Sequence, residues 1–295
     1  MTPALARAWR VKACAKINVT LRVLGTRTDG YHELRTTFQS LSLHDTLTVE
    51  HVRGPFAITS DDPRCPTDAS NLVWKAAAGL WHSTGRRAPL ANVRVHLRKR
   101  IPMEAGLGGG SSDAAATLLA LRALWRLEIP NAELLAIAGS LGADVPFFLS
   151  GGTVLGLERG DVLFPLFDAE PAWVVIACPD FGVSTPEAFR WWDEAHQAAA
   201  ARLEHSRGPE AINDLQAPVC LHHPRISKLV KALSRSRARP AAMSGSGSAV
   251  FGLFETRAAA VAGAAGLNSS RVATWVTRTT TRSQHSRASA PQPLR

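Results

Sequence analysis

The sequence has few cysteines and no paired cysteine pattern. Its 295 residues include four cysteines with no C-x-x-C pair and no histidine at zinc-ligand spacing: Cys14, Cys65, Cys178 and Cys220. This excludes a disulfide scaffold and a structural zinc site, and it favours a reduced cytoplasmic protein. No apolar run is long enough for a signal peptide near the N-terminus or for a membrane span elsewhere. We therefore expect neither a structural metal nor a membrane contact.

Acidic residues are outnumbered, with 24 Asp and Glu against 34 Lys and Arg, a net charge of +10. The excess is local and has no aromatic side chains interleaved with it; it gathers at Arg235, Arg237 and Arg239 and at Arg278, Arg282, Arg287 and Arg295. Nucleic-acid surfaces usually combine basic and aromatic side chains. We interpret residues 278–295 as a basic, disordered tail. A nucleic-acid-binding protein stays an alternative, which salt-sensitive DNA retention without this tail would favour.

The length of the chain indicates two domains, because one small core would not occupy 295 residues. Strict alternation over Val11–Val23 predicts a half-buried strand with one polar face. Helices are expected at residues 70–83, 131–141 and 185–203. Short proline-bounded strands follow residue 160, so we place an N-terminal domain at 1–160 and a C-terminal domain at 161–277.

Glycine is concentrated in the segment Ile101–Ala116, which reads I-P-M-E-A-G-L-G-G-G-S-S-D-A-A-A. The segment joins an alternating strand at residues 93–97 to an apolar helix, and Ser111 and Ser112 can cap that helix. A glycine loop before a helix N-terminus makes an anion site, because backbone amides and the helix dipole face the ligand. A flexible linker is the alternative, although linkers seldom precede a capped apolar helix at once.

The glycine loop matches neither standard phosphate fingerprint. It lacks the lysine of G-x-x-x-x-G-K-[ST], and Ser111 stands where G-x-G-x-x-G needs its third glycine. It is therefore a third kind of phosphate loop. A side chain at Gly109 is expected to intrude where the backbone must approach a phosphate.

Asp144 lies in G-A-D-V-P-F-F-L, a carboxylate among apolar residues directly after an expected helix end. Such a group suits proton acceptance from an alcohol. The alternative, that Asp144 only caps the segment beginning at Val145, is equally compatible with the sequence. Three further features are weak individually: Lys16 and Asn18 on one strand face, G-Y-H-E with Tyr31 and His32, and a second Gly/Ser loop at residues 244–248.

In combination these motifs resemble the GHMP kinases. The motifs are A-K-I-N (15–18), G-Y-H-E (30–33), P-M-E-A-G-L-G-G-G-S-S-D (102–113), G-A-D-V-P-F-F (142–148) and M-S-G-S-G-S (243–248). The resemblance runs from about Val11 to about Thr277, includes R-G-D at 159–161 and N-D-L at 213–215, and does not cover the basic tail.

The resemblance implies a two-domain fold of mixed α/β and α+β type. An N-terminal β/α domain would carry the glycine loop, a C-terminal α+β domain would be ferredoxin-like, and the active site would lie in the cleft between them. Family members transfer the γ-phosphoryl group of ATP to an alcohol with Mg²⁺. The resemblance is strongest to members whose substrate is a cytidine diphosphate sugar alcohol of the non-mevalonate isoprenoid pathway. It implies no nucleic acid or membrane partner, and a monomer or homodimer.

Other functions within the family fold stay open. A homoserine- or mevalonate-type kinase is disfavoured, because G-Y-H-E beside A-K-I-N suits a substrate that bears a nucleobase. A non-catalytic nucleotide sensor is a third alternative, although Lys16 and Asp144 are both intact.

The resemblance also implies roles for individual residues. Asp144 would engage the acceptor hydroxyl and Lys16 would hold charge beside it. The triphosphate would lie on Pro102, Met103, Glu104, Ala105, Gly106, Leu107, Gly108, Gly109, Gly110, Ser111 and Ser112, with Ser112 a candidate Mg²⁺ ligand. The adenine side would be Asn71, Leu72 and Lys99. The cytidine diphosphate and sugar alcohol would contact Asn18, Tyr31, His32, Thr185 and Phe189.

Glu104 departs from the family pattern, which usually has a small residue there. A carboxylate beside a triphosphate would repel it. We therefore expect Glu104 to point outward or to meet a lysine such as Lys99.

Overall fold

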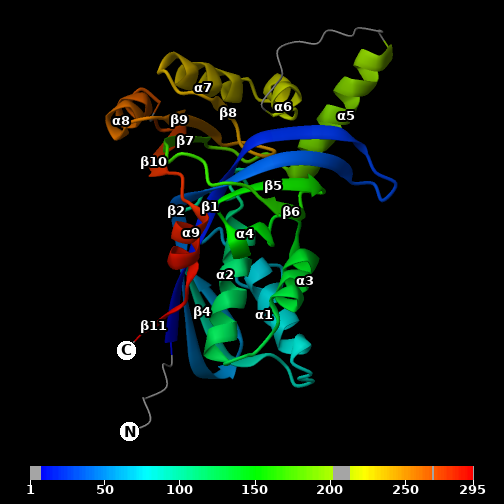
Figure 1. The fold of residues 1–295 in the computed structure, drawn as a ribbon, viewed down its shortest axis with the longest axis vertical. Helices are drawn as coiled ribbons and strands as arrows, with labels where there is room; N and C mark the ends of the chain where they lie inside the picture. The colour runs from blue at the N-terminus through cyan, green and yellow to red at the C-terminus, as the bar shows by residue number, and fades with distance from the viewer. Residues whose placement is uncertain (1–7, 202–212, 268, 295) are drawn as a thin grey trace.

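The first domain is built on a seven-stranded sheet. The computed structural model describes residues 8–201, 213–267 and 269–294. The strand order of this sheet is β11-β1-β2-β4-β3, and β5 pairs with β2 while β6 pairs with β5. They are β1 (Ala8–Thr26), β2 (His32–Pro55), β3 (Ala57–Ser60), β4 (Ala91–Arg98), β5 (Thr153–Glu158), β6 (Val162–Pro165) and β11 (Gln292–Leu294). The helices of this domain are α1 (Leu72–Ser83), α2 (Gly109–Leu124), α3 (Asn131–Leu141) and α4 (Phe147–Ser150) (Figure 1).

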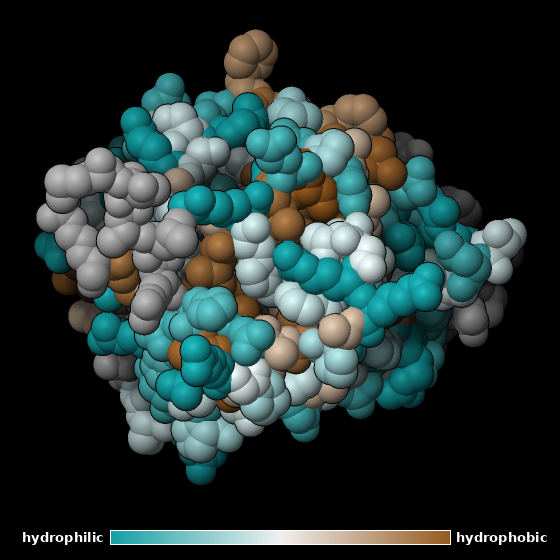
Figure 2. Space-filling view, turned by 90° about the horizontal axis from the view of Figure 1, so that it is seen from below, coloured by the Kyte–Doolittle hydropathy of each residue, from teal (hydrophilic) through white to brown (hydrophobic). Residues whose placement is uncertain are grey.

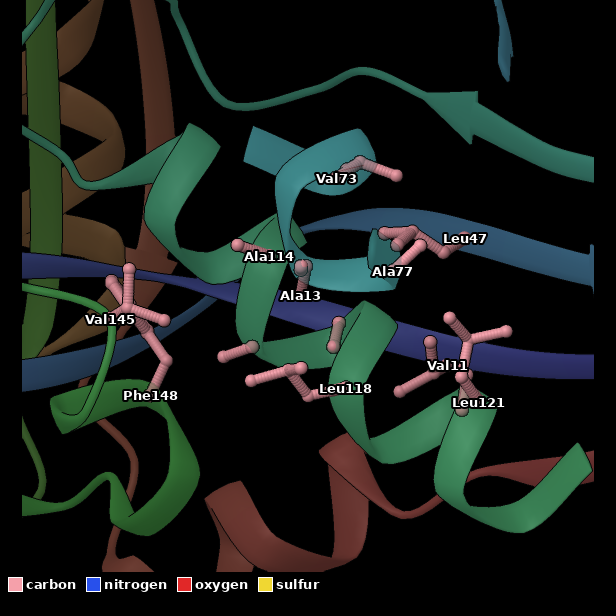
Figure 3. Close-up of a cluster of buried hydrophobic side chains, with 14 of the residues drawn as sticks. Val11, Ala13, Leu47, Val73, Ala77, Ala114, Leu118, Leu121, Val145 and Phe148 are labelled. Carbon is pink, nitrogen blue, oxygen red and sulfur yellow. The ribbon is translucent and has the colours of Figure 1, made fainter. Parts of the chain in front are cut away.

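An apolar core lies between this sheet and its helices. Val11 and Ala13 of β1 and Leu118 and Leu121 of α2 are all fully or almost fully buried in it (Figure 3). The alternation at the start of β1 therefore has the predicted cause, since Val11 and Ala13 face the core and Lys12 faces solvent.

The middle of β1 differs from the prediction. Cys14 to Asn18 are buried on both faces of the strand, and bulges interrupt the pairing with β2 between Cys14 and Lys16 and between Asn18 and Thr20. The predicted polar face is therefore covered by protein, which places Lys16 and Asn18 in the interior.

The second domain contains a four-stranded antiparallel sheet in the order β10-β7-β9-β8. Its elements are β7 (Trp173–Pro179), α5 (Thr185–Ala201), α6 (Gln216–His222), α7 (Pro224–Arg235), β8 (Ala241–Met243), β9 (Val250–Phe254), α8 (Arg257–Ala265) and β10 (Val272–Arg278). Helices thus separate β7 from β8 and β9 from β10, which is the β-α-β-β-α-β plan of a ferredoxin-like domain. This confirms the predicted fold class. Leu203, the expected end of the long helix, lies outside the described residues.

A third apolar cluster joins the two domains. Ile17 of β1 and Leu107 of the glycine loop pack in it with Ile176 of β7 and Phe251 of β9, and all four are buried. Burial of large apolar side chains from both sheets holds the domains against each other. The cleft walls are therefore positioned by packed side chains.

The prediction of a disordered basic tail was wrong. Residues 282–289 form α9 (Arg282–Ser289), and β11 pairs with the start of β1 in the first sheet. Thr281 and Gln284 form a reciprocal capping box that starts α9. His285 and Ser289 are buried. The basic residues suggested a solvated segment, but the tail contains its own helix start signal and a strand that covers a sheet edge.

The domain boundary also differs from residue 160. β6 pairs antiparallel with β5, so residues 162–165 belong to the first sheet, and the tail returns to it after β10.

In the described part of the chain, no helix is long and apolar enough to cross a membrane. The end of the molecule seen in Figure 2 is mainly hydrophilic, with small hydrophobic areas between polar side chains.

Candidate active site

Two adjoining cavities lie along the glycine loop. One, of about 670 Å³, is lined by residues 101–111 together with Asn71, Leu72 and Lys99. The other, of about 820 Å³, is lined by residues from both domains. They share a wall formed by Gly106, Ser111, Asp144, Thr185, Pro186 and Ser246. The two cavities therefore meet at the glycine loop and Asp144.

The predicted residues lie at the two cavities largely by role, and Gly106, Ser111 and Thr185 line both. The first cavity contains every residue assigned to ATP except Ser112. The second is lined by Lys16 and by every residue assigned to the acceptor substrate, namely Asn18, Tyr31, His32, Thr185 and Phe189. Asp144 lies at both.

Lys16 and Asp144 form an ion pair at this shared wall. The Lys16 Nζ lies 3.2 Å from the Asp144 Oδ2, and the side chains are 4% and 34% exposed respectively. The ammonium also donates to the Asn18 Oδ1 at 2.6 Å, and the Asn18 amide donates to the Thr36 hydroxyl at 2.7 Å. Asp144 thus combines a fixed cationic partner with access to the cavity.

The capping alternative for Asp144 is not supported. The residue at the N-cap of α4 is Pro146, and no side chain caps this helix. The apolar sequence neighbours of Asp144 do not enclose its carboxylate, which is one-third exposed and paired with Lys16.

The glycine loop lies directly against Lys16. The Lys16 amide donates to the Leu107 carbonyl at 3.0 Å. At Gly108, where φ is +70°, a Cβ atom would lie 2.6 Å from the Phe148 ring and 3.2 Å from the Lys16 Cε. The close approach of loop, α4 and lysine therefore requires glycine at this position.

The start of α2 offers unpaired amides. The helix begins at Gly109, and its first three amides, those of residues 109–111, have no protein acceptor among the described residues. Such amides, with the positive end of the helix dipole, favour an anion. The expected serine cap is absent: the N-cap is Gly108, which has no side chain to cap with.

Two details of the loop contradict the expectations. The Ser112 hydroxyl is buried, donates to the Cys14 carbonyl at 2.7 Å and lines neither cavity, so its candidacy as a Mg²⁺ ligand is not supported. At Gly109 a Cβ atom would lie 3.1 Å from Ile101, in the protein interior. A side chain there would disturb the core first.

Lys99 belongs to a buried charge cluster behind the first cavity. Its ammonium lies 2.5 Å from an oxygen of Asp45 and 2.6 Å from one of Asp113. Burial raises the pKa of Asp113 to about 7, against the opposing effect of Lys99. Burial also acts to lower the pKa of Lys99, but the two carboxylates raise it above its usual value. Glu104 is exposed but lines the first cavity, and Lys99 is engaged by Asp45 and Asp113, so the expected contact of Glu104 with Lys99 is absent.

The second Gly/Ser loop packs on the first. The Ser244 hydroxyl donates to the Gly106 carbonyl at 3.0 Å and accepts from the backbone N–H of Asn18 at 3.3 Å. The Asn213 side chain donates to the Met243 and Gly245 carbonyls, both at 2.8 Å. The loop is thus fixed in the site, where it contributes Gly245 and Ser246 to the second cavity.

Aromatic side chains gather at the far end of the second cavity. The His32 ring stacks on Phe189 with centroids 4.5 Å apart, and its Nε2 lies 2.8 Å from the Asp193 Oδ1. Tyr31 is 58% exposed and has the Arg159 guanidinium 5.3 Å from its ring centroid.

Sequence reasoning missed two acidic residues that contact predicted site residues, Asp193 and Asp113. Asp193 follows Phe189 by four residues, so one helix face presents both, and this spacing was the available signal. Asp113 was visible as a carboxylate in the loop motif, but its partners come from distant segments.

Comparison with known proteins shows which family the chain belongs to. Residues 71–152 match the GHMP kinases N terminal domain and residues 193–271 match GHMP kinases C terminal. A 4-diphosphocytidyl-2-C-methyl-D-erythritol kinase of Moorella thermoacetica is 40% identical over 82% of this chain and 88% of its own length. A solved 4-(cytidine 5'-diphospho)-2C-methyl-D-erythritol kinase superposes with TM-score 0.74 and 37% identity, covering 92% of this chain and 98% of its own.

A homoserine kinase of Cytophaga hutchinsonii superposes with TM-score 0.68 at 19% identity, covering 100% of this chain and 99% of its own, and this likeness concerns the fold alone. The sequence identity to the cytidylylated-substrate kinases is high enough, over most of both chains, to establish membership. The chain belongs to the GHMP kinase family, in the branch of the 4-diphosphocytidyl-2-C-methyl-D-erythritol kinases.

Proposed function

We propose that this chain phosphorylates the 2-hydroxyl of 4-diphosphocytidyl-2-C-methyl-D-erythritol with ATP, giving the 2-phosphate and ADP, in the non-mevalonate isoprenoid pathway. The Lys16–Asp144 pair at the wall shared by two cavities carries this proposal. A kinase must bring the terminal phosphoryl group of its donor to the acceptor hydroxyl, and a shared wall is where two bound substrates would meet.

The donor and acceptor take separate cavities in this proposal. ATP takes the cavity of the glycine loop, with its phosphates on the unpaired amides of residues 109–111 and its adenine towards Asn71 and Leu72. The cytidylylated substrate takes the second cavity, with its base at Tyr31, His32 and Phe189. Membership of a kinase family supports ATP as the phosphoryl donor.

Asp144 and Lys16 then act at the reacting atoms. The Asp144 carboxylate accepts the proton of the 2-hydroxyl as the oxygen bonds to the γ-phosphorus, and the bond to the β-phosphate oxygen breaks. Lys16 holds Asp144 in place and offsets the negative charge of the transferring group. Because phosphoryl transfer has a loose transition state, alignment and charge neutralisation contribute most of the rate, and proton acceptance adds to them.

Mg²⁺ fits the shared wall. The described residues contain no group of three histidine, cysteine or acidic side chains that could hold a metal. Mg²⁺ in kinases needs no such group, because one or two protein oxygens and the substrate phosphates hold it. We assign to it the Ser111 hydroxyl together with the substrate phosphates, since Ser111 lines both cavities, and leave the Asp144 carboxylate to the acceptor hydroxyl. Bound Mg²⁺ would neutralise charge on the phosphate oxygens.

A coupled ADP-release assay tests this function. We expect turnover with the cytidylylated methylerythritol that far exceeds turnover with homoserine or mevalonate at equal concentration. A higher kcat/KM for homoserine or mevalonate would contradict the substrate assignment. ATP binding without ADP release on any of the three would instead favour a nucleotide sensor.

Two further properties belong to this proposal. All four cysteines are free, and we propose that the enzyme works in the cytoplasm. We propose a monomer or homodimer, which sedimentation analysis over a range of concentrations distinguishes.

A further inference from the structure

Two β-bulges set apart the short segment of β1 that carries Lys16. The pairing with β2 shifts between Cys14 and Lys16 and again between Asn18 and Thr20. Bulges beside an active site re-aim side chains out of the regular alternation of a strand. Lys16 and Asn18 are both buried, so their polar groups are satisfied by protein partners.

The Lys16 ammonium has two protein acceptors among the described residues. Its Nζ lies 3.2 Å from the Asp144 Oδ2 and 2.6 Å from the Asn18 Oδ1. An ammonium has three N–H donors in tetrahedral arrangement, so fixing the directions of two of them fixes the third. The third N–H is then available to the transferring phosphoryl group. Asn18 thus helps to set the direction in which Lys16 acts.

Thr36 of β2 determines which end of the Asn18 amide faces the lysine. The Thr36 hydroxyl donates to the Thr20 carbonyl at 2.7 Å, and a hydroxyl has one hydrogen to donate. Towards the Asn18 Nδ2, which lies 2.7 Å away, the same hydroxyl therefore acts as acceptor. This contact holds the amide nitrogen at Thr36 and leaves the amide oxygen to Lys16.

We propose that Thr36 is a positioning residue for phosphoryl transfer, which acts on Lys16 through the Asn18 amide. The hydrogen bonds run from the Lys16 ammonium to Asn18, from Asn18 to the Thr36 hydroxyl, and from this hydroxyl to the Thr20 carbonyl. Thr36 is buried in the strand that faces β1. The inference rests on the proposed reaction and adds the group that fixes the direction of its lysine.

Thr36→Val provides the sharpest test, because valine is close to threonine in shape and lacks the hydroxyl. The buried Asn18 Nδ2 then loses its acceptor, which is costly, so the amide turns and its oxygen leaves the ammonium. We expect kcat to fall on the order of tenfold, with the KM values for ATP and for the cytidylylated substrate changed by less than about twofold. Thr36→Ser keeps the hydroxyl and should keep most of the turnover.

Thr37→Val is the matched control. Thr37 is the next residue on β2, its hydroxyl lies 3.0 Å from that of Thr20, and it lines neither active-site cavity. Asn18→Ala, alone and combined with Thr36→Val, completes a double-mutant cycle. Because Thr36 acts through Asn18, the double variant should have the kcat of Asn18→Ala. Independent effects would instead multiply.

Nitrogen-15 NMR of the lysine ammonium groups follows Lys16 in the full chain without any substrate. We expect its signal to move in Thr36→Val and to stay in place in Thr36→Ser and Thr37→Val. Thermal unfolding checks that each variant is folded, and Thr36→Ala, which should show the same loss, replaces the valine variant if that one does not fold.

Three results would each overturn the inference: unchanged kcat in a folded variant without the hydroxyl, a failure of Thr36→Ser to keep turnover, or losses that multiply in the double-mutant cycle. A Lys16 signal that moves only when the hydroxyl is removed, in a chain that does not turn over the cytidylylated substrate, would support the positioning of Lys16 and count against the proposed reaction alone.

Discussion

At the scale of single residues, the proposed chemistry depends on a buried lysine beside a partly exposed carboxylate. Lys16 is held by Asn18 and by the backbone of the glycine loop, so its position does not depend on Asp144 alone. The Asp144 side chain is one-third exposed, and an asparagine in its place would still offer an oxygen to the buried Lys16 ammonium, which also donates to Asn18. Changes at Asp144 should therefore affect turnover far more than folding.

We predict that Asp144→Asn keeps the fold and ATP binding but lowers turnover by about 10²–10⁴-fold, because the amide cannot accept the hydroxyl proton. Single-turnover kinetics, nucleotide titration and thermal unfolding measure the three properties. Glu255→Gln, which removes an exposed charge away from both cavities, is the control. Near-native turnover of Asp144→Asn would exclude the catalytic role.

We predict that Tyr31→Ala and Phe189→Ala each weaken binding of the cytidylylated substrate about five- to 150-fold. Stacking of an aromatic ring on a base usually contributes about 1–3 kcal/mol, which corresponds to this range. ATP should be little affected, since both rings line only the second cavity. KM values for the two substrates measure the contrast. Phe164→Ala on β6 changes an exposed ring outside both cavities and serves as control. Equal increases in both KM values would show that the base lies elsewhere.

At the scale of elements, α9 connects the C-terminus to the catalytic segment. The His285 Nε2 lies 2.9 Å from the Phe148 carbonyl of α4, and α4 begins three residues after Asp144. The Arg282 guanidinium donates to the carbonyls of Thr153 and Leu166. This segment therefore supports the structure immediately behind the active site.

Deleting residues 282–295 is predicted to lower both the melting temperature and turnover, since α4 loses its contact with His285 and β1 loses an edge partner. Thr281→Ala removes only the cap of α9, so it should lower the free energy of unfolding by about 0.5–2 kcal/mol and leave turnover almost unchanged. Calorimetry and the ADP-release assay measure both. A truncated chain of unchanged stability would support the original interpretation as a solvated tail.

The docking of α9 should depend on pH. Burial lowers the pKa of His285 below its ordinary value of 6.5, with the bond to Phe148 opposing this effect. The unfolded chain then binds a proton more readily than the folded chain, so stability from the neutral imidazole is present above about pH 6.5 and is lost as the pH falls towards the folded pKa.

We predict that the melting temperature of the unmodified chain falls relative to that of His285→Gln between about pH 7.5 and about pH 5. Asp113 has the opposite pH dependence: because its pKa is raised to about 7, its contribution to stability is lost as the pH rises. Both chains contain Asp113, so subtracting one curve from the other removes this contribution. Parallel curves over this range would show that His285 is not buried as a neutral group.

At the scale of the whole molecule, we expect the shared apolar cluster to make the two domains unfold as one cooperative unit. Phe251 is fully buried in it, whereas Phe167 is fully exposed. We predict that Phe251→Ala lowers the free energy of unfolding by about 3–5 kcal/mol, and that Phe167→Ala has almost no effect. Urea unfolding followed by tryptophan fluorescence measures both. Two separate transitions in the unmodified chain would contradict a joint core.

The sequence by itself determined the family and the fold class, and it named many of the residues that line the two cavities. The motifs around Lys16, Gly106 and Asp144 are contiguous stretches whose local order reflects one strand, one loop and one turn, so they are readable without the fold. The helices at residues 131–141 and about 70–83 were also predicted from local signals, and the structure has them at Asn131–Leu141 and Leu72–Ser83.

Tertiary structure alone decided the pairings. The Lys16 strand face is buried because a loop distant in the sequence covers it, and the tail is ordered because α9 docks on α4 and β11 on β1. The same holds for Lys99 with Asp45 and for His32 with Asp193. Charge and polarity along the chain indicate exposure only on average. Whether a particular lysine or histidine is buried depends on which distant segment packs against it, and local sequence does not contain that information.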